Sequence, residues 1–210
     1  MTRIAVLDYG MGNLRSVEKA FERVGARAER VTDPDRAGDA DGLVLPGVGA
    51  FPEAMRRLRA QGFDALVRDW AASKRPLLGV CLGMQLLFSR SSENEGADGL
   101  GLLEGEVGEL RAPGLKVPHI GWEPVRWERP SRVADGLMTD VQTPFYFVHS
   151  FAARPADPGD VAGTAEHGER FAAVVERDSV MGAQFHPEKS SEAGLRMLAN
   201  FAGLCAPVAA

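Results

Sequence analysis

One cysteine in this sequence lies between two glycines at the end of an apolar run, a setting in which a thiol can act as a nucleophile. Residues 77–85 read Leu-Leu-Gly-Val-Cys-Leu-Gly-Met-Gln, so an apolar run leads into a Gly-x-Cys-x-Gly turn and an apolar-periodic segment follows. This layout is typical of the nucleophile elbow of α/β enzymes, with Cys81 in place of serine. A helix that begins just after Cys81 would favour the reactive thiolate through its partial positive charge.

A histidine and a glutamate far downstream supply the partners that a nucleophilic thiol needs. Residues 182–190 read Gly-Ala-Gln-Phe-His-Pro-Glu-Lys-Ser. An imidazole can take the proton of the thiol and return it to the leaving group, and a carboxylate can fix the tautomer of that imidazole. In an extended segment His186 and Glu188 point to the same side, roughly 6.5 Å apart between Cα atoms. We therefore predict a catalytic triad of Cys81, His186 and Glu188.

The elements that must position this triad follow from hydrophobic patterns. Continuous apolar runs predict strands buried on both faces of a mainly parallel sheet, at 4–7, 42–45 and 76–80. Helical periodicity predicts helices at 13–24, 53–60, 62–72, 82–89 and 192–202. Between about 105 and 182, several strands are expected around Pro/Gly turns at 113–114 and 157–159. The prediction is an α/β fold over 1–210: one domain, a mainly parallel central sheet flanked by helices, and an antiparallel portion in the second half.

The composition is that of a compact globular enzyme. The 210 residues are 45% hydrophobic and 25% charged, and the formal net charge of -5 argues against a nucleic-acid partner. The two cysteines, Cys81 and Cys205, are too few for a disulfide scaffold, and Cys205 is interpreted as an inert thiol. The sequence opens on a strand without a signal-peptide pattern, and no apolar run nears the ~20 residues of a membrane span. We expect a cytoplasmic location and no membrane partner.

Together, the two catalytic segments resemble those of the class I, triad-type glutamine amidotransferases. Further blocks resemble the branch of this family that serves histidine biosynthesis, at 8–17, 45–51, 116–122, 146–150 and 186–190. The resemblance implies that the chain hydrolyses L-glutamine to glutamate and ammonia through a cysteinyl thioester. It also implies a heterodimer in which a (β/α)8-barrel cyclase receives the ammonia, and a glutaminase subunit that needs no cofactor or metal.

Two other functions stay open as alternatives. An amidotransferase that delivers ammonia to another acceptor, such as an anthranilate, aminodeoxychorismate or guanylate synthase, would keep the same triad. The blocks at 8–17 and 116–122 disfavour it, because they resemble the histidine-pathway branch. A non-catalytic binding module on the same fold would be expected to lack a triad residue, whereas all three are present here.

The resemblance also implies roles for residues around the triad. The backbone amides of Val48 and Leu82 would form the oxyanion hole, after a reorientation of the first peptide. Without the resemblance, segment 46–49 is simply a Pro-Gly turn and Gln85 the polar face of a helix. Because Glu95 follows closely in the same loop, it competes with Glu93 for the role of substrate contact. The implied contacts to glutamine are Gly49, Gln85, Glu93, Ser150 and Phe151.

A second implied set faces the partner subunit, and one position beside it departs from the family pattern. This set comprises Asn13, Trp122, Tyr146 and Lys189. Glu123 stands where the family usually has asparagine, which places a negative charge at the expected interface. Alternatively, Trp122 and the nearby Trp127 could both be core residues rather than residues that face the partner.

Three histidines and a glycine pair receive structural interpretations. His119 and His149 lie in apolar, strand-like contexts and are interpreted as structural or interface residues rather than a second base. His167 is expected at a hairpin tip, without a role. Segment 10–12, Gly-Met-Gly, follows the first strand, but Arg15 replaces the third glycine of a dinucleotide motif. We therefore expect a tight strand-to-helix turn there.

Overall fold

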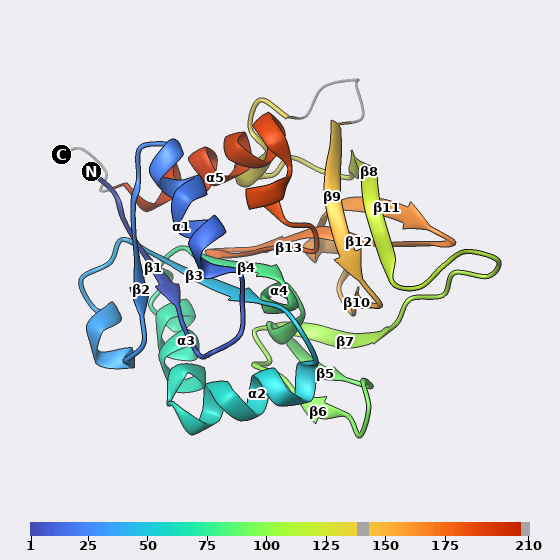
Figure 1. Cartoon of the computed structure of the whole chain (residues 1–210), viewed down its shortest axis with the longest axis horizontal. Helices are drawn as coiled ribbons and strands as arrows, with labels where there is room; N and C mark the ends of the chain where they lie inside the picture. The colour runs from blue at the N-terminus through green and yellow to red at the C-terminus, as the bar shows by residue number, and fades with distance from the viewer. Residues whose placement is uncertain (138–142, 207–210) are drawn as a thin grey trace.

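The structure, a computed structural model, describes residues 1–137 and 143–206 and is organised around two sheets (Figure 1). Within these ranges the larger sheet has the strand order β2-β1-β3-β4-β13-β12-β11-β8-β9, and the smaller has the order β10-β7-β5-β6. The strands are β1 (Arg3–Leu7), β2 (Arg27–Val31), β3 (Gly42–Gly47), β4 (Leu77–Cys81), β5 (Phe88–Ser91), β6 (Ala97–Asp98), β7 (Leu103–Glu109), β8 (His119–Trp127), β9 (Thr143–His149), β10 (Phe151–Pro155), β11 (Val161–His167), β12 (Glu169–Arg177) and β13 (Val180–Ala183).

Helices cover both faces of the larger sheet. The α-helices are α1 (Leu14–Arg23), α2 (Phe51–Ala60), α3 (Phe63–Ala72), α4 (Leu82–Leu86) and α5 (Ser191–Cys205), with 3-10 turns η1 (Pro34–Ala37), η2 (Arg132–Ala134), η3 (Pro158–Asp160) and η4 (Pro187–Lys189). In Figure 1, α1 and α5 lie together on one face, and α2 and α3 lie on the other. Among the described residues, no helix has the length and apolar character needed to cross a membrane.

The parallel half of the sheet confirms the predicted α/β fold. Strands β2, β1, β3, β4 and β13 pair in parallel, and β12, β11, β8 and β9 extend the sheet in antiparallel fashion. Parallel strands with helices on both sides of the sheet are buried on both faces. This is why β3 and β4 are continuous apolar runs in which every residue is buried. The predicted antiparallel portion in the second half is therefore present.

The structure differs from the sequence prediction at two places. The helix predicted at 82–89 ends at Leu86, and Phe88–Ser91 is strand β5, which pairs with β7. Residues 82–88 are all buried, so their apolar run is compatible with a buried strand as well as with a helix. The residues from Phe88 onward form a strand because they pair with β7 of the smaller sheet. The edge strand β2 was not predicted, because its sequence Arg-Ala-Glu-Arg-Val is too polar to resemble a buried strand.

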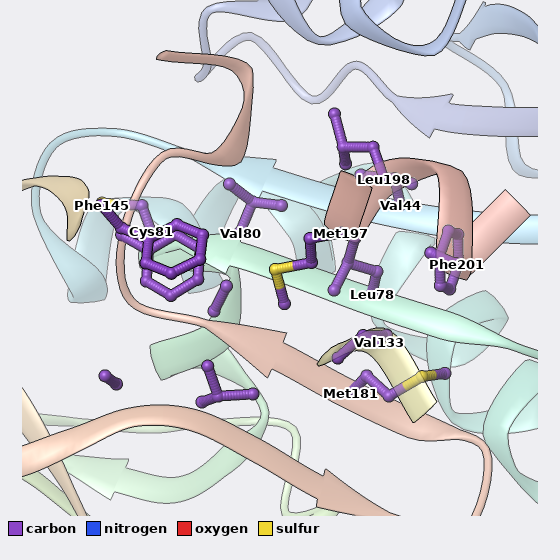
Figure 2. Close-up of a cluster of buried hydrophobic side chains, with 14 of the residues drawn as sticks. Val44, Leu78, Val80, Cys81, Val133, Phe145, Met181, Met197, Leu198 and Phe201 are labelled. Carbon is purple, nitrogen blue, oxygen red and sulfur yellow. The ribbon is translucent and has the colours of Figure 1, made fainter. Parts of the chain in front are cut away.

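The core on the α5 face carries the strand that ends at the cysteine. Figure 2 shows Met197, Leu198 and Phe201 of α5 directed at Val44 of β3 and Leu78 of β4. These side chains are almost fully buried, and burying a side chain of this size contributes about 1.5–3 kcal/mol. The same cluster continues to Cys81, so packing of the core fixes the end of β4 where the thiol lies.

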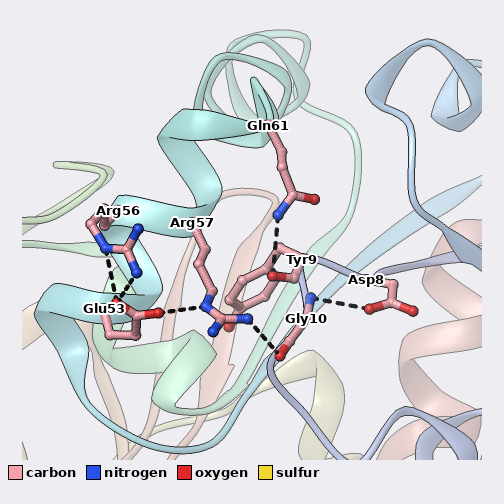
Figure 3. Close-up of polar contacts among 7 residues, drawn as sticks. All are labelled: Asp8, Tyr9, Gly10, Glu53, Arg56, Arg57 and Gln61. Carbon is pink, nitrogen blue, oxygen red and sulfur yellow. Dashed lines mark hydrogen bonds and ion pairs between the residues drawn. The ribbon is translucent and has the colours of Figure 1, made fainter.

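The turn after β1 is fastened to α2 and to Gln61, the residue that follows α2, as Figure 3 shows. Arg57 Nη1 donates to the carbonyl oxygen of Gly10 at 3.2 Å, and Gln61 Nε2 donates to that of Tyr9 at 3.2 Å. The Gly10 amide donates to Asp8 Oδ1 at 3.1 Å, and Gly10 has a φ of +84°. The predicted tight turn between strand and helix is present, and it leads directly into α1.

Close contact between α4 and β3 generates the first prediction. A β-carbon at Gly83 would overlap the carbonyl oxygen of Leu45, which is backbone and cannot rotate away. We expect Gly83→Ala to lower the free energy of unfolding by about 3 kcal/mol, because α4 must move off the sheet. Urea unfolding followed by circular dichroism measures this loss.

The matched control is Gly203→Ala in α5, where an added β-carbon meets no atom within 4 Å. This variant is expected to be neutral or to gain about 0.5–1 kcal/mol, because alanine has less conformational entropy to lose than glycine. Equal losses in the two variants would contradict the packing argument.

Candidate active site

Cys81 occupies the predicted strand–turn–helix position. It is the last residue of β4 and immediately precedes α4. Its φ of +54° and ψ of −113° lie in a region that residues with a β-carbon rarely adopt, and such strain persists only where the surroundings impose it. Here the imposing contacts come from Gly83, which lets α4 approach β3 closely. The thiol is thereby held at the carboxyl end of the sheet, and Cys81 is 6% exposed.

His186 and Glu188 form a buried pair at the same end of the sheet. His186 follows β13, the neighbour of β4, and its amide donates to the carbonyl oxygen of Tyr146 at 2.9 Å. His186 Nδ1 lies 2.9 Å from Glu188 Oε1, and their side chains are only 5% and 2% exposed. The contact at Nδ1 leaves the other ring nitrogen free for the thiol, which is the arrangement of a triad.

Electrostatics favour a charged imidazole at this site. Burial by itself lowers the pKa of His186, but hydrogen bonds to Cys81 and to Glu188 outweigh burial and raise its pKa to about 9. The imidazole therefore holds a proton at neutral pH, which a departing amine can receive. Because burial would penalise an unpaired carboxylate, the same proton also compensates the charge of Glu188.

A cavity of about 300 Å³ opens beside the thiol. It brings together Cys81 and His186, the predicted nucleophile and base, with most of the other residues that the sequence singled out. Those lining it are Val48, Gly49, Leu82, Gln85, Glu93, Ser150, Phe151 and Lys189. Glu188 stands behind His186 rather than in the wall, as expected of an orienting group. A cavity of this size suits a small amino-acid substrate.

Two polar side chains of the cavity have defined partners. Gln85 is buried, and its Nε2 donates to the carbonyl oxygen of Phe151 at 2.9 Å. Glu93 Oε2 accepts from the amide of Phe51 at 2.7 Å, at the start of α2. Glu95 is exposed and is not part of the cavity wall, so of the two glutamates the structure places Glu93 at the cavity.

Sequence reasoning did not place Gln184, His149, Pro118 or Val148 at this site. Gln184 is fully buried, and its Nε2 lies 3.9 Å from Cys81 Sγ while its Oε1 accepts from Gln85 at 3.0 Å. His149 lines the cavity and lies 2.9 Å, through Nδ1, from the carbonyl oxygen of Phe151. Gln184 could have been found from the sequence, because its amide side chain lies between the apolar residues Ala183 and Phe185 at a strand end. A buried amide needs a hydrogen-bond partner, which indicates a polar site nearby.

The residues expected at a partner interface are exposed or partly exposed, and Lys189 also lines the cavity. Trp122 of β8 is 49% exposed and pairs across the strands with Tyr146 of β9, their ring centroids 5.7 Å apart. Asn13 and Lys189 are exposed as well. Trp127 instead packs against the core, so the core alternative holds for Trp127 and fails for Trp122.

Comparison with known proteins identifies the family. The sequence pattern of the class I glutamine amidotransferases matches residues 5–204 of this chain. The chain belongs to that family. Imidazole glycerol phosphate synthase subunit HisH of Moorella thermoacetica is 50% identical over 97% of this chain and 96% of its own length. The HisH subunit of Syntrophotalea carbinolica is 48% identical over 94% of this chain and 98% of its own length.

Solved structures agree on the fold. A crystal structure described as a glutamine amidotransferase superposes with a TM-score of 0.74 at 24% identity, over 95% of this chain and 98% of that one. The structure of PurLQS from Thermotoga maritima superposes with a TM-score of 0.76 at 20% identity, over 95% of this chain and 97% of that one. The α/β fold predicted from the sequence is the fold of this family.

The buried histidine–glutamate pair predicts a pH-dependent stability. Because the folded pKa of His186 is raised from 6.5 to about 9, its contribution is full below pH 6.5 and is lost as the pH rises through 9. That shift corresponds to about 3 kcal/mol, shared between Cys81 and Glu188. We expect Glu188→Gln to cost about 1–2 kcal/mol in urea unfolding at pH 6 and clearly less at pH 10.

Glu192→Gln on the exposed first turn of α5 is the control, with the same change of charge and no pH-dependent effect. A loss in Glu188→Gln that is equal at the two pH values would show that the pair does not depend on the proton of His186.

Proposed function

We propose that this chain is the glutaminase of an imidazole glycerol phosphate synthase, which releases ammonia from L-glutamine for a (β/α)8-barrel cyclase. The observation that carries the proposal is the position of Cys81 on a strained elbow, at a cavity that it shares with His186, whose ring is paired with Glu188. Family membership supports the substrate class. The HisH names of the relatives support the reaction that consumes the ammonia.

In the proposed first step, the Cys81 thiolate attacks the side-chain carboxamide carbon of glutamine. The carbonyl electrons move to oxygen, giving a tetrahedral intermediate that the backbone amides of Val48 and Leu82 stabilise. Collapse of this intermediate breaks the C–N bond, and His186 donates its proton so that the leaving group departs as ammonia. Cys81 is left as a γ-glutamyl thioester.

In the second step, His186 takes a proton from a water molecule as that water attacks the thioester carbon. The thiolate leaves, glutamate is released, and His186 is again charged beside Glu188. Glu188 accepts from Nδ1 throughout, and so keeps the other ring nitrogen directed at the reacting atoms.

We assign substrate recognition to residues that line the cavity at a distance from the thiol. Gln85 is held by Gln184 and by the Phe151 carbonyl, so it is preorganised to meet a polar group of the substrate. Glu93 supplies the carboxylate that can bind the α-ammonium group. The remaining proposed contacts are Gly49 and the backbone of Ser150 and Phe151.

Loss of ammonia to water supplies the chemical reason for a partner, because protonated ammonia is not nucleophilic. Several large apolar side chains are exposed: Val48 lines the cavity, Val117 precedes the cavity residue Pro118, and Ile120 and Trp122 lie two residues apart on β8. Exposed apolar side chains of this kind fit a protein interface. We assign Asn13, Trp122, Tyr146 and Lys189 to the contact with the cyclase in a heterodimer, and propose that residues 1–210 act there as one domain in the cytoplasm.

The decisive test compares two nitrogen sources. The Cys81→Ala variant in complex with the cyclase is expected to lose synthesis from glutamine by at least 10³-fold, because no thioester can form. Synthesis from added ammonium salt should stay near the wild-type rate, since the cyclase chemistry is untouched. Loss of ammonia-driven synthesis would contradict this division of labour, and wild-type glutamine hydrolysis that is indifferent to the cyclase would indicate another acceptor.

Lys189 offers a test of coupling between the subunits. It is exposed at the cavity and directly follows the triad segment. We expect Lys189→Ala to lower the ratio of synthase product to released glutamate. Its free energy of unfolding should stay within about 0.5 kcal/mol of the wild-type value. Lys74→Ala, at an exposed position that is not part of the cavity wall, is the control and should keep the ratio. An unchanged ratio in Lys189→Ala would remove this residue from the interface.

A further inference from the structure

A second cluster of polar side chains lies beyond the catalytic cavity, between β8 and the hairpin of β11 and β12. His119 and Glu123 come from β8, and His167 is the last residue of β11. One possible ligand atom from each lies within 4.8 Å of the others. The rings of His119 and His167 stack with centroids 4.1 Å apart, so two imidazoles and a carboxylate meet at one point of the fold.

Hydrogen bonding fixes which nitrogen of His119 faces this cluster. His149 Nδ1 lies 2.9 Å from the carbonyl oxygen of Phe151, which can only accept, so Nδ1 of His149 carries the proton. Neutral His149 then accepts at Nε2, where His119 Nδ1 lies 3.2 Å away and must donate. In neutral His119 the remaining nitrogen, Nε2, therefore bears a lone pair.

No donor among the described residues satisfies this lone pair. His119 Nε2 is buried without a hydrogen-bond partner, and Glu123 Oε1, itself an acceptor, lies 3.9 Å away. His167 Nε2 lies 3.0 Å from the carbonyl oxygen of Lys116 and so donates, which leaves Nδ1 as the ring nitrogen that can serve as a ligand. A cation at this cluster would satisfy the buried His119 Nε2 and the Glu123 carboxylate beside it.

We propose that His119, Glu123 and His167 bind a divalent cation of the zinc class, with water at the fourth position. Two imidazoles and one carboxylate form a known ligand set for Zn²⁺ with an open site. His119 already has the outer bond that such ligands make, because its Nδ1–H is donated to His149.

Binding requires the cluster to close and the His167 ring to tilt out of its stack on His119, because the lone pairs of near-parallel rings lie in parallel planes and do not converge on one ion. Ligand atoms around a tetrahedral zinc ion lie about 3.4 Å apart, given bonds of about 2.1 Å. Glu123 has a side chain that is 36% exposed, and His167 lies at the end of a hairpin, so these two can turn toward the fixed His119. His119 is buried and would hold the ion in place, whereas Glu123 and His167 would move toward the ion when it binds.

The proposed ion would also affect the catalytic cavity. Coordination at His119 Nε2 holds the proton on Nδ1, which keeps His149 as the acceptor and keeps its own Nδ1–H on the Phe151 carbonyl. Gln85 donates to that same carbonyl. The ion would therefore stabilise the wall of the cavity without taking part in the thioester chemistry, and the proposal is independent of the proposed function.

The test uses the full chain carrying Cys81→Ala, because the catalytic thiol would itself bind zinc. After treatment with a chelator, Zn²⁺ is titrated in by calorimetry and Co²⁺ binding is followed by absorption. One equivalent is expected to bind, with a cobalt spectrum of nitrogen and oxygen ligands that lacks thiolate charge transfer. Glu123→Gln and His167→Phe in the same background should each weaken binding at least tenfold.

Both test positions are partly exposed, so the variants are expected to fold, and circular dichroism verifies this. Glu192→Gln, with the same change of charge on α5, is the matched control and should bind as the parent does. The proposal is overturned if the parent binds no zinc, if Glu123→Gln and His167→Phe bind it unchanged, or if the control loses binding equally.

Discussion

Backbone contact between α4 and β3 is the constraint on which the active site depends. Gly83 lies against the Leu45 carbonyl, and a β-carbon at Gly79 would come within 2.7 Å of the Gly83 carbonyl oxygen. Only hydrogen atoms fit at these two positions, so the chain can turn from β4 into α4 within one residue. Cys81 carries the resulting strain, which the buried core beneath β3 and β4 balances.

The strand order then brings the base to the nucleophile. Strand β13 pairs in parallel with β4, so the segment that follows β13 leaves the sheet at the same edge as Cys81. Ser190 fixes this segment, since its hydroxyl donates to the His186 carbonyl at 2.7 Å and accepts from the Tyr146 amide at 3.0 Å. The triad is thus assembled from two neighbouring strands, and β9 holds the histidine in place.

Burial explains why the polar groups behind the cavity form chains of hydrogen bonds. An unpaired buried donor costs about 1–3 kcal/mol, so each side chain there is held by another. Gln85 joins Gln184 to the Phe151 carbonyl, and His149 and His119 extend this network from the same carbonyl to β8. The network ends at His119 Nε2, the one member with a lone pair that nothing in the described chain satisfies.

The sequence by itself determined the chemistry and the local backbone. Residue types and short spacings predict Cys81 on an elbow and the neighbouring His186 and Glu188, because these features depend on a few consecutive residues. Only the tertiary structure placed Glu93 rather than Glu95 in the cavity wall, placed Gln184 beside the thiol, and paired His119 with His149. Those outcomes depend on strand register and on burial between distant segments, which the periodicity of a single segment does not encode.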